Sequence, residues 1–162
     1  MSTTGQMFRK NITPERYETD KREIDKMLTE IGFSFQHSED RCGMTWYSVS
    51  SGSFYVDEDG EECVRQFRIV LEKDPGGLYS ANGSEKIYSD NLYFEGFRGG
   101  YGCDIDGNPA PGSEDLLLQF LHRYLQYDPE ALFTIAWDSF LAKADIDRIY
   151  DSGNRTEWYR YA

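Results

Sequence analysis

The sequence predicts a single α+β domain: an N-terminal helix, a five- to six-stranded and mostly antiparallel sheet, and a C-terminal helical pair packed on one face. Three observations predict this fold class. Residues 44–97 contain short apolar runs separated by turn residues, with no helical segment that could connect parallel strands. Helical patterns lie before and after this stretch. The chain of 162 residues has the length of one ordinary domain.

The clearest strand spans residues 62–72, because Phe67, Ile69 and Leu71 alternate with more polar positions. Asp59-Gly60 before it and Asn82-Gly83 after it are hairpin signals, since glycine accepts the positive φ of a tight turn. Ser51-Gly52 is expected to end an earlier strand. The other expected strands are 33–36, 44–49, 53–56, 78–81 and 86–94.

Residues 1–12 are predicted to be a flexible arm, and residues 13–162 are predicted to form the single domain. A helix is expected over 14–31, with Thr13 as its N-terminal cap and Gly32 as its C-terminal cap. Its apolar side chains repeat at helical spacing, which indicates that one face packs on the sheet.

The C-terminal helical pair is expected to begin with residues 113–126, where two acids in the first turn complement the helix dipole. Asp128-Pro129-Glu130 predicts a second helical start. Within this second helix, residues 132–137 also have strand propensity, so the sequence is compatible with a helix or a strand over these residues. The aromatic residues 156–162 are expected to form an edge strand or an exposed peptide.

Charge is concentrated in the middle of the chain. The net charge is −12, and residues 57–115 hold 14 acidic and 5 basic side chains, a net of −9. Such a field repels nucleic acid and anionic membranes, and it attracts basic protein surfaces. No apolar run is long enough to cross a membrane, and the N-terminus lacks a signal-peptide core. Three widely spaced cysteines favour a cytoplasmic location over a disulfide framework.

No catalytic residue, metal ligand set or cofactor is predicted. Asp104, Asp106 and Asn108 are similar to the start of a calcium loop, but Pro109 occupies the position that requires glycine. Whether the segment from Asp104 to Asp115 binds a metal stays open. The chain has two histidines, and nothing around either one supports nucleophilic catalysis.

The sequence hypothesis is therefore a non-catalytic acidic binding protein that covers a basic surface of a partner protein, such as a nucleic-acid-binding enzyme. Immunity, inhibitor and counter-defence proteins are of this kind. The alternative is a small-molecule-binding domain or enzyme with an aromatic pocket between the sheet and the C-terminal helices. The residues expected to contact the partner are Asp57, Glu58, Asp59, Glu61, Glu62, Phe97, Tyr101, Asp104, Asp106, Trp158, Tyr159 and Tyr161.

Overall fold

A computed structural model describes residues 5–56, 59–74, 78–80, 87–96, 113–135, 139–153 and 158 of the chain. The described strands form one antiparallel sheet in the order β2-β3-β4-β6-β1-β7-β8, and β5 pairs with β6 outside this path. The α+β class is confirmed, with more strands than the sequence predicted. The strands are β1 (Gly5–Arg9), β2 (Ser34–Glu39), β3 (Met44–Val56), β4 (Glu62–Glu72), β5 (Leu78–Ser80), β6 (Ile87–Glu95), β7 (Leu132–Ile135) and β8 (Phe140–Leu141).

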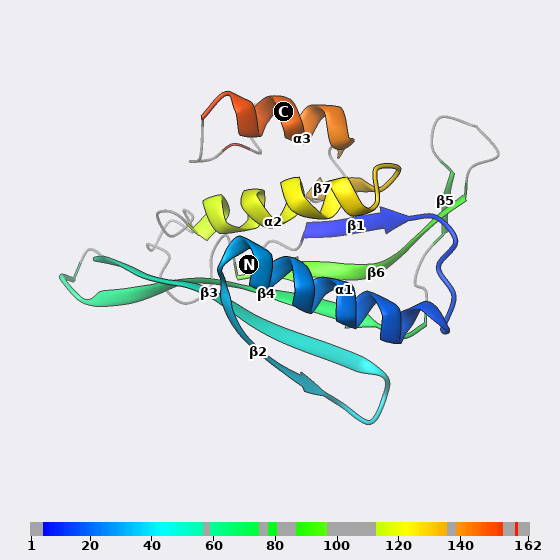
Figure 1. Ribbon diagram of the computed structural model, residues 1–162, viewed down its shortest axis with the longest axis horizontal. Helices are drawn as coiled ribbons and strands as arrows, with labels where there is room; N and C mark the ends of the chain where they lie inside the picture. Colours follow the sequence, from blue (N-terminus) through cyan, green and yellow to red (C-terminus); the bar gives the residue numbers. More distant parts are fainter. Residues whose placement is uncertain are drawn as a thin grey trace.

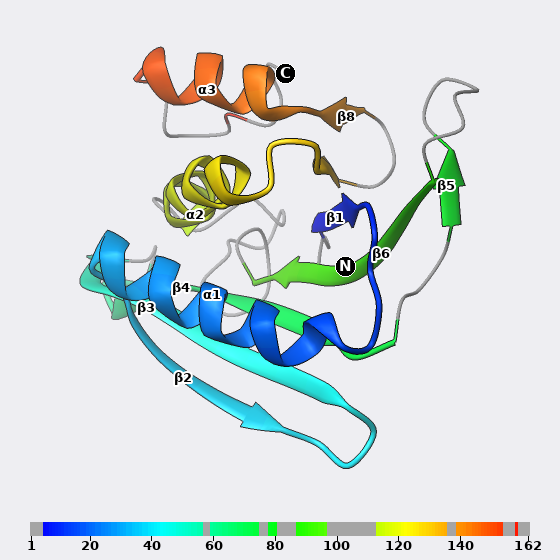
Figure 2. The ribbon, with the colours of Figure 1, turned by 45° about the vertical axis from the view of Figure 1, so that its right-hand side comes forward.

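The helices are α1 (Arg16–Ile31), α2 (Ser113–Tyr127) and α3 (Lys143–Asp151). α2 lies between the other two and also contacts β4 (Figure 1). The sheet curves so that β8 lies beside α3 (Figure 2). Apolar side chains of α1, α2 and β4 share one core, which includes Met27, Phe67, Ile69, Leu71 and Phe120. The helices therefore cover one face of β4, and no helix of the described ranges lies on its other face.

The prediction of a flexible arm was wrong for residues 5–9, which form the interior strand β1. Residues 1–4 lie outside the described part of the chain. β1 pairs with β6 on one side and β7 on the other. Met7, Phe8 and Arg9 have no exposed surface. Gly5 fits closely, since a Cβ atom there would lie 2.8 Å from Cε2 of Phe133. Pairing with β6 and β7, which lie far away in the sequence, makes this short segment a strand, and no local residue pattern predicts that pairing.

The expected division of residues 44–56 into two strands was also wrong, because β3 is continuous. Ser50 pairs with Gln66 and Phe54 pairs with Val64, so β3 has three residues where β4 has one. Gly52 adopts φ +76° at this irregularity. The glycine therefore serves a β-bulge instead of a turn, and both strands extend further.

The helix predicted over 14–31 is present but begins at Arg16. Glu15, and not Thr13 as expected, occupies the N-cap position of α1. The backbone oxygen of Thr13 accepts a hydrogen bond from the amide of Arg16 in the turn before the helix. Gly32 ends the helix at φ 95°, in the left-handed conformation predicted for it. The helix expected at 113–126 corresponds closely to α2.

The second C-terminal helix lies later than predicted. Residues 132–135 and 140–141 are strands, and the helix α3 follows them. Of the two alternatives left open by the sequence, residues 132–135 form a strand because they pair with β1. This pairing gives their backbone N–H and C=O groups the hydrogen bonds that a helix would otherwise provide locally. α2 and α3 still form a helical pair: the rings of His122 and Tyr150 stack 3.8 Å apart with an angle of 6° between their planes.

Candidate protein-binding surface

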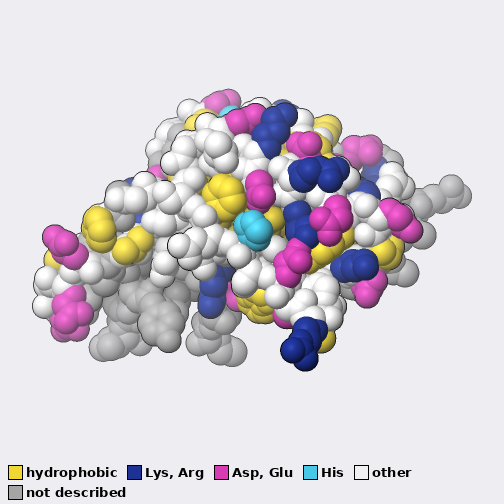
Figure 3. Space-filling model, turned by 60° about the horizontal axis from the view of Figure 1, so that its bottom comes forward, with side chains coloured by type: hydrophobic (Ala, Val, Ile, Leu, Met, Phe, Trp, Pro, Cys, Tyr) yellow, Lys and Arg dark blue, Asp and Glu magenta, His cyan; other side chains and the backbone are white. Residues whose placement is uncertain are grey.

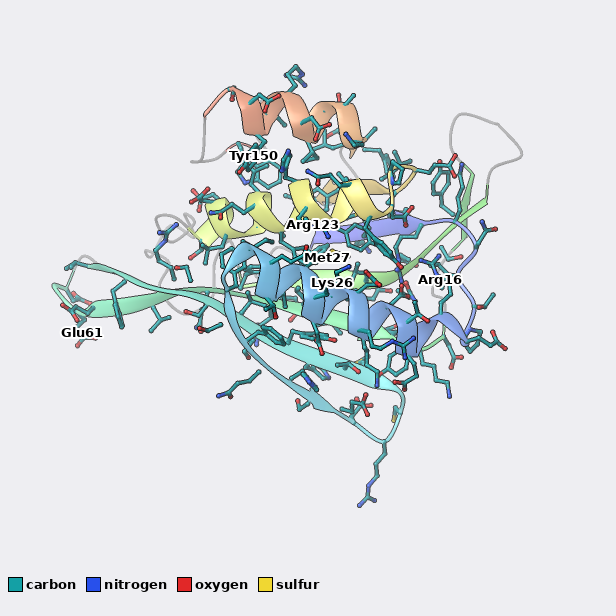
Figure 4. All side chains as sticks on the ribbon, in the orientation of Figure 1. Arg16, Lys26, Met27, Glu61, Arg123 and Tyr150 are labelled. Carbon is teal, nitrogen blue, oxygen red and sulfur yellow. The ribbon has the colours of Figure 1, made fainter. Side chains whose placement is uncertain are left out.

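The joined ends of β3 and β4 extend past α1 and α2, at the left of Figure 1. We call this ribbon the arm and define it by residues 51–56 and 59–66. The bulge at Gly52 lets β3 follow β4 outward, and Gly60, with φ +80°, lies in the turn between them. Figure 4 shows Glu61 at the end of the arm, away from the labelled side chains of the helices.

Exposed large hydrophobic side chains in the described part of the chain lie on β3 and β4. Phe54 is 59% exposed, Val56 63%, Val64 40% and Trp46 37%. Single exposed apolar residues are common, but contiguous apolar patches are typical of interaction surfaces. Phe54, Val56 and Val64 lie next to one another at the joined ends of β3 and β4, and Trp46 lies apart from them.

These four side chains share one face. Phe54 pairs directly with Val64, and Trp46 pairs with Val70, so each pair points to the same side. Even-numbered residues of β4 point away from Phe67 and Ile69, which are buried in the helix-covered core. The four exposed side chains therefore lie on the helix-free face of β3 and β4.

Acidic side chains adjoin this apolar surface at the end of the arm. Asp59, Glu61 and Glu62 are all exposed. Figure 3 shows acidic and hydrophobic side chains side by side at the projecting left end of the molecule. These three acids were predicted to bind a partner, and the structure places them together next to Val56, which pairs with Glu62.

Basic residues near the base of the arm are already engaged. Arg65 forms an ion pair with Asp115 of α2 at 3.1 Å. Arg68 lies 3.5 Å from Glu95 on β6. The Arg65–Asp115 pair also connects the arm to the helical layer.

The prediction that Trp158 contacts a partner was wrong. It is fully buried, and its ring lies 6.0 Å from that of Phe133. Its indole N–H donates a hydrogen bond of 2.7 Å to the backbone oxygen of Glu114. A side chain enclosed in this way cannot contact a partner without unfolding its surroundings.

Eight other predicted contact residues lie outside the described part of the chain: Asp57, Glu58, Phe97, Tyr101, Asp104, Asp106, Tyr159 and Tyr161. Of the segment considered for calcium, Asp115 is described, and it binds Arg65. Within the described ranges, no three histidine, cysteine or acidic side chains are placed to hold a metal ion.

A second polar cluster lies inside the molecule, where Arg9 joins four elements. Its guanidinium lies 3.1 Å from Oδ2 of Asp20 and donates to the hydroxyl of Tyr124 at 3.0 Å and to Asn91. Burial raises the pKa of the nearby Asp128 carboxyl, although Arg9 and Arg16 act to lower it. Because Arg9, Asp20, Asn91 and Tyr124 are all buried, this cluster stabilises the fold and offers no open surface.

Comparison with known proteins adds no relative: no family model, curated protein or solved structure matches this chain. None of the helices in the described ranges is long and apolar enough to cross a membrane.

Proposed function

We propose that this protein is a non-catalytic acidic binding protein that covers a basic surface of a partner protein, as immunity, inhibitor and counter-defence proteins do. One observation carries the proposal: the arm presents exposed apolar side chains and exposed acids on adjoining parts of one projecting ribbon. Apolar contact supplies affinity, and the acids attract and orient a basic partner.

The magnitudes are sufficient for specific binding. Fully burying a side chain such as Phe or Val contributes roughly 1.5–3 kcal/mol. Phe54, Val56 and Val64 are each 40% exposed or more, so a large part of this energy is still available in the free protein. A cluster of charges of one sign raises association rates by about 10- to 1000-fold at low salt.

The proposal includes a cytoplasmic location. Cys42 is exposed as a free thiol in the turn after β2. An exposed unpaired thiol suits a reducing compartment.

The test begins with an N-terminally tagged full-length chain expressed in its native cell and purified at low and moderate salt. We expect a stoichiometric basic protein that dissociates as the salt concentration rises. Its association rate is then measured with the arm variant Asp59→Lys/Glu61→Lys/Glu62→Lys. We expect this variant to associate at least about tenfold more slowly at low salt, because charge steering is lost.

A matched control separates the local field of the arm from the total charge. The variant Glu18→Lys/Asp74→Lys/Asp151→Lys changes the net charge equally but alters exposed acids elsewhere in the fold. The proposal predicts a much smaller effect from this control. Equal slowing by the two variants, or binding that does not depend on salt, would contradict a role for the acids of the arm.

A further inference from the structure

The helix-free face of β3 and β4 carries two apolar rows with a polar interval between them. Phe54 and Val64 form one row, and Trp46 and Val70 form the other. The rows are six residues apart on β4, a separation of about 20 Å at ~3.3 Å per residue. The polar interval contains Ser48, Ser50, Gln66 and Arg68.

The two rows differ in what they offer to a partner. Val70 is only 3% exposed, and Trp46 beside it is 37% exposed. In the outer row Phe54 is 59% exposed and Val64 is 40% exposed, and Val56 next to them is 63% exposed. The accessible apolar surface is therefore concentrated on the arm, where it can enter a recess of another molecule.

Charge selects the kind of molecule that can occupy this surface. Asp59, Glu61 and Glu62 adjoin the apolar residues, and the net charge of the chain is −12. A second copy would bring like charges together, and an anionic membrane would be repelled. A partner with lysine and arginine side chains around an apolar recess is complementary in both respects.

We propose that the arm docks into an apolar recess of a partner protein, which receives Phe54, Val56 and Val64, while Lys and Arg at its rim contact Asp59, Glu61 and Glu62. This inference rests on the proposed function and specifies the contact by which it acts. It assigns the two sets of residues separate effects. The apolar set determines how long the complex lasts, and the acidic set determines how fast it forms.

Two substitutions and two controls separate these effects. Phe54→Ser and Val64→Thr remove apolar surface from exposed positions, where folding stability is expected to change by less than about 0.5 kcal/mol. Phe54→Leu keeps an apolar side chain in the same place. Gln66→Ala alters the same face of β4 one pleat away from Val64, within the polar interval.

The probe is a phage-displayed library of random 16-residue peptides selected on the folded full-length chain. We expect enriched peptides that combine a large apolar residue with several Lys or Arg residues. Their affinity should fall at least about tenfold for Phe54→Ser and for Val64→Thr, the scale of interface anchors. It should stay within about threefold of wild type for Phe54→Leu and Gln66→Ala.

Each other outcome overturns the inference. Peptides that bind Phe54→Ser as well as wild type dock elsewhere, and failure to enrich basic peptides shows that the arm does not select them. Concentration-dependent dimers in sedimentation, abolished by Phe54→Ser, identify a second copy as the occupant. If the acid reversal on the arm slows binding of the co-purified partner but Phe54→Ser leaves its affinity unchanged, this inference fails while the proposed function stands.

Discussion

Replacing Arg9 by Met should strongly destabilise the protein, because it removes the cation at the centre of the buried cluster. Arg9 is fully buried, and Asp20, 3.1 Å from it, is 2% exposed. Removing one partner of a buried ion pair costs about 3–5 kcal/mol, since the other charge is left uncompensated. Arg16 lies 3.4 Å from Oδ1 of Asp20 and is partly exposed, so it compensates in part. We therefore expect a loss of about 3 kcal/mol, which is a large share of a domain's stability.

The assay is urea unfolding followed by circular dichroism, with the free energy of unfolding extrapolated to zero denaturant. The matched variant Arg9→Met/Asp20→Leu removes both charges and should recover at least half of the loss. A loss below about 1 kcal/mol for Arg9→Met would contradict a stabilising role for the buried Arg9–Asp20 pair and the placement of β1 inside the sheet. A double variant no more stable than the single one would show that the buried carboxylate is not the cause.

Three further predictions concern the fold. Gly5→Ala should lower the unfolding free energy by about 1–3 kcal/mol, because the new methyl group would displace Phe133; unchanged urea unfolding would contradict the pairing of β1. Burial raises the pKa of Asp128, so its contribution to stability falls as pH rises from about 4 through the folded pKa. Asp128→Asn should remove that part of the pH dependence of Tm, and a parallel curve would contradict it. His122→Gln should speed hydrogen exchange in α3, because the stack on Tyr150 and the contact with Asp147 are lost. The free energy of local opening of α3 should fall by about 0.5–1 kcal/mol. Exchange that speeds equally throughout the core would contradict a local role.

The sequence predicted correctly those features that a local residue pattern determines. The alternation of Phe67, Ile69 and Leu71 predicted β4 because one side of that strand lies under the helices. Gly32 predicted the end of α1 because a left-handed residue is needed there. In both cases the conformation depends on neighbouring residues or on one buried face, so it can be predicted from the residue pattern alone.

Long-range pairing explains the errors. Gly5–Arg9 is too short to show a period, and β6 and β7 make it a strand. The start signal at Pro129 suggested a helix, but pairing with β1 prevailed at Phe133. Trp158 was expected to contact a partner, but it packs against Phe133 in the core, and this long-range contact is not visible in the sequence.

The candidate site was predicted in part. The acids around Gly60 were evident from composition and from the turn signal. Phe54 and Val64 were missed, because the sequence does not show which face of β4 the helices leave open. Arg65 and Arg68 lie on opposite faces of β4, so the sequence pattern left the open face undecided. In the structure Arg65 lies on the helix side and binds Asp115.

Whether the arm is the binding surface can be measured by a hydrogen-exchange footprint of the chain bound to its co-purified basic partner. We expect amides in residues 46–66 to be protected on binding, while those of α3 exchange as in the free protein. The same footprint with Phe54→Ser should show weaker protection of the arm at equal partner concentration. Protection confined to the helices, with residues 51–66 unchanged, would contradict the assignment of the arm as the binding surface.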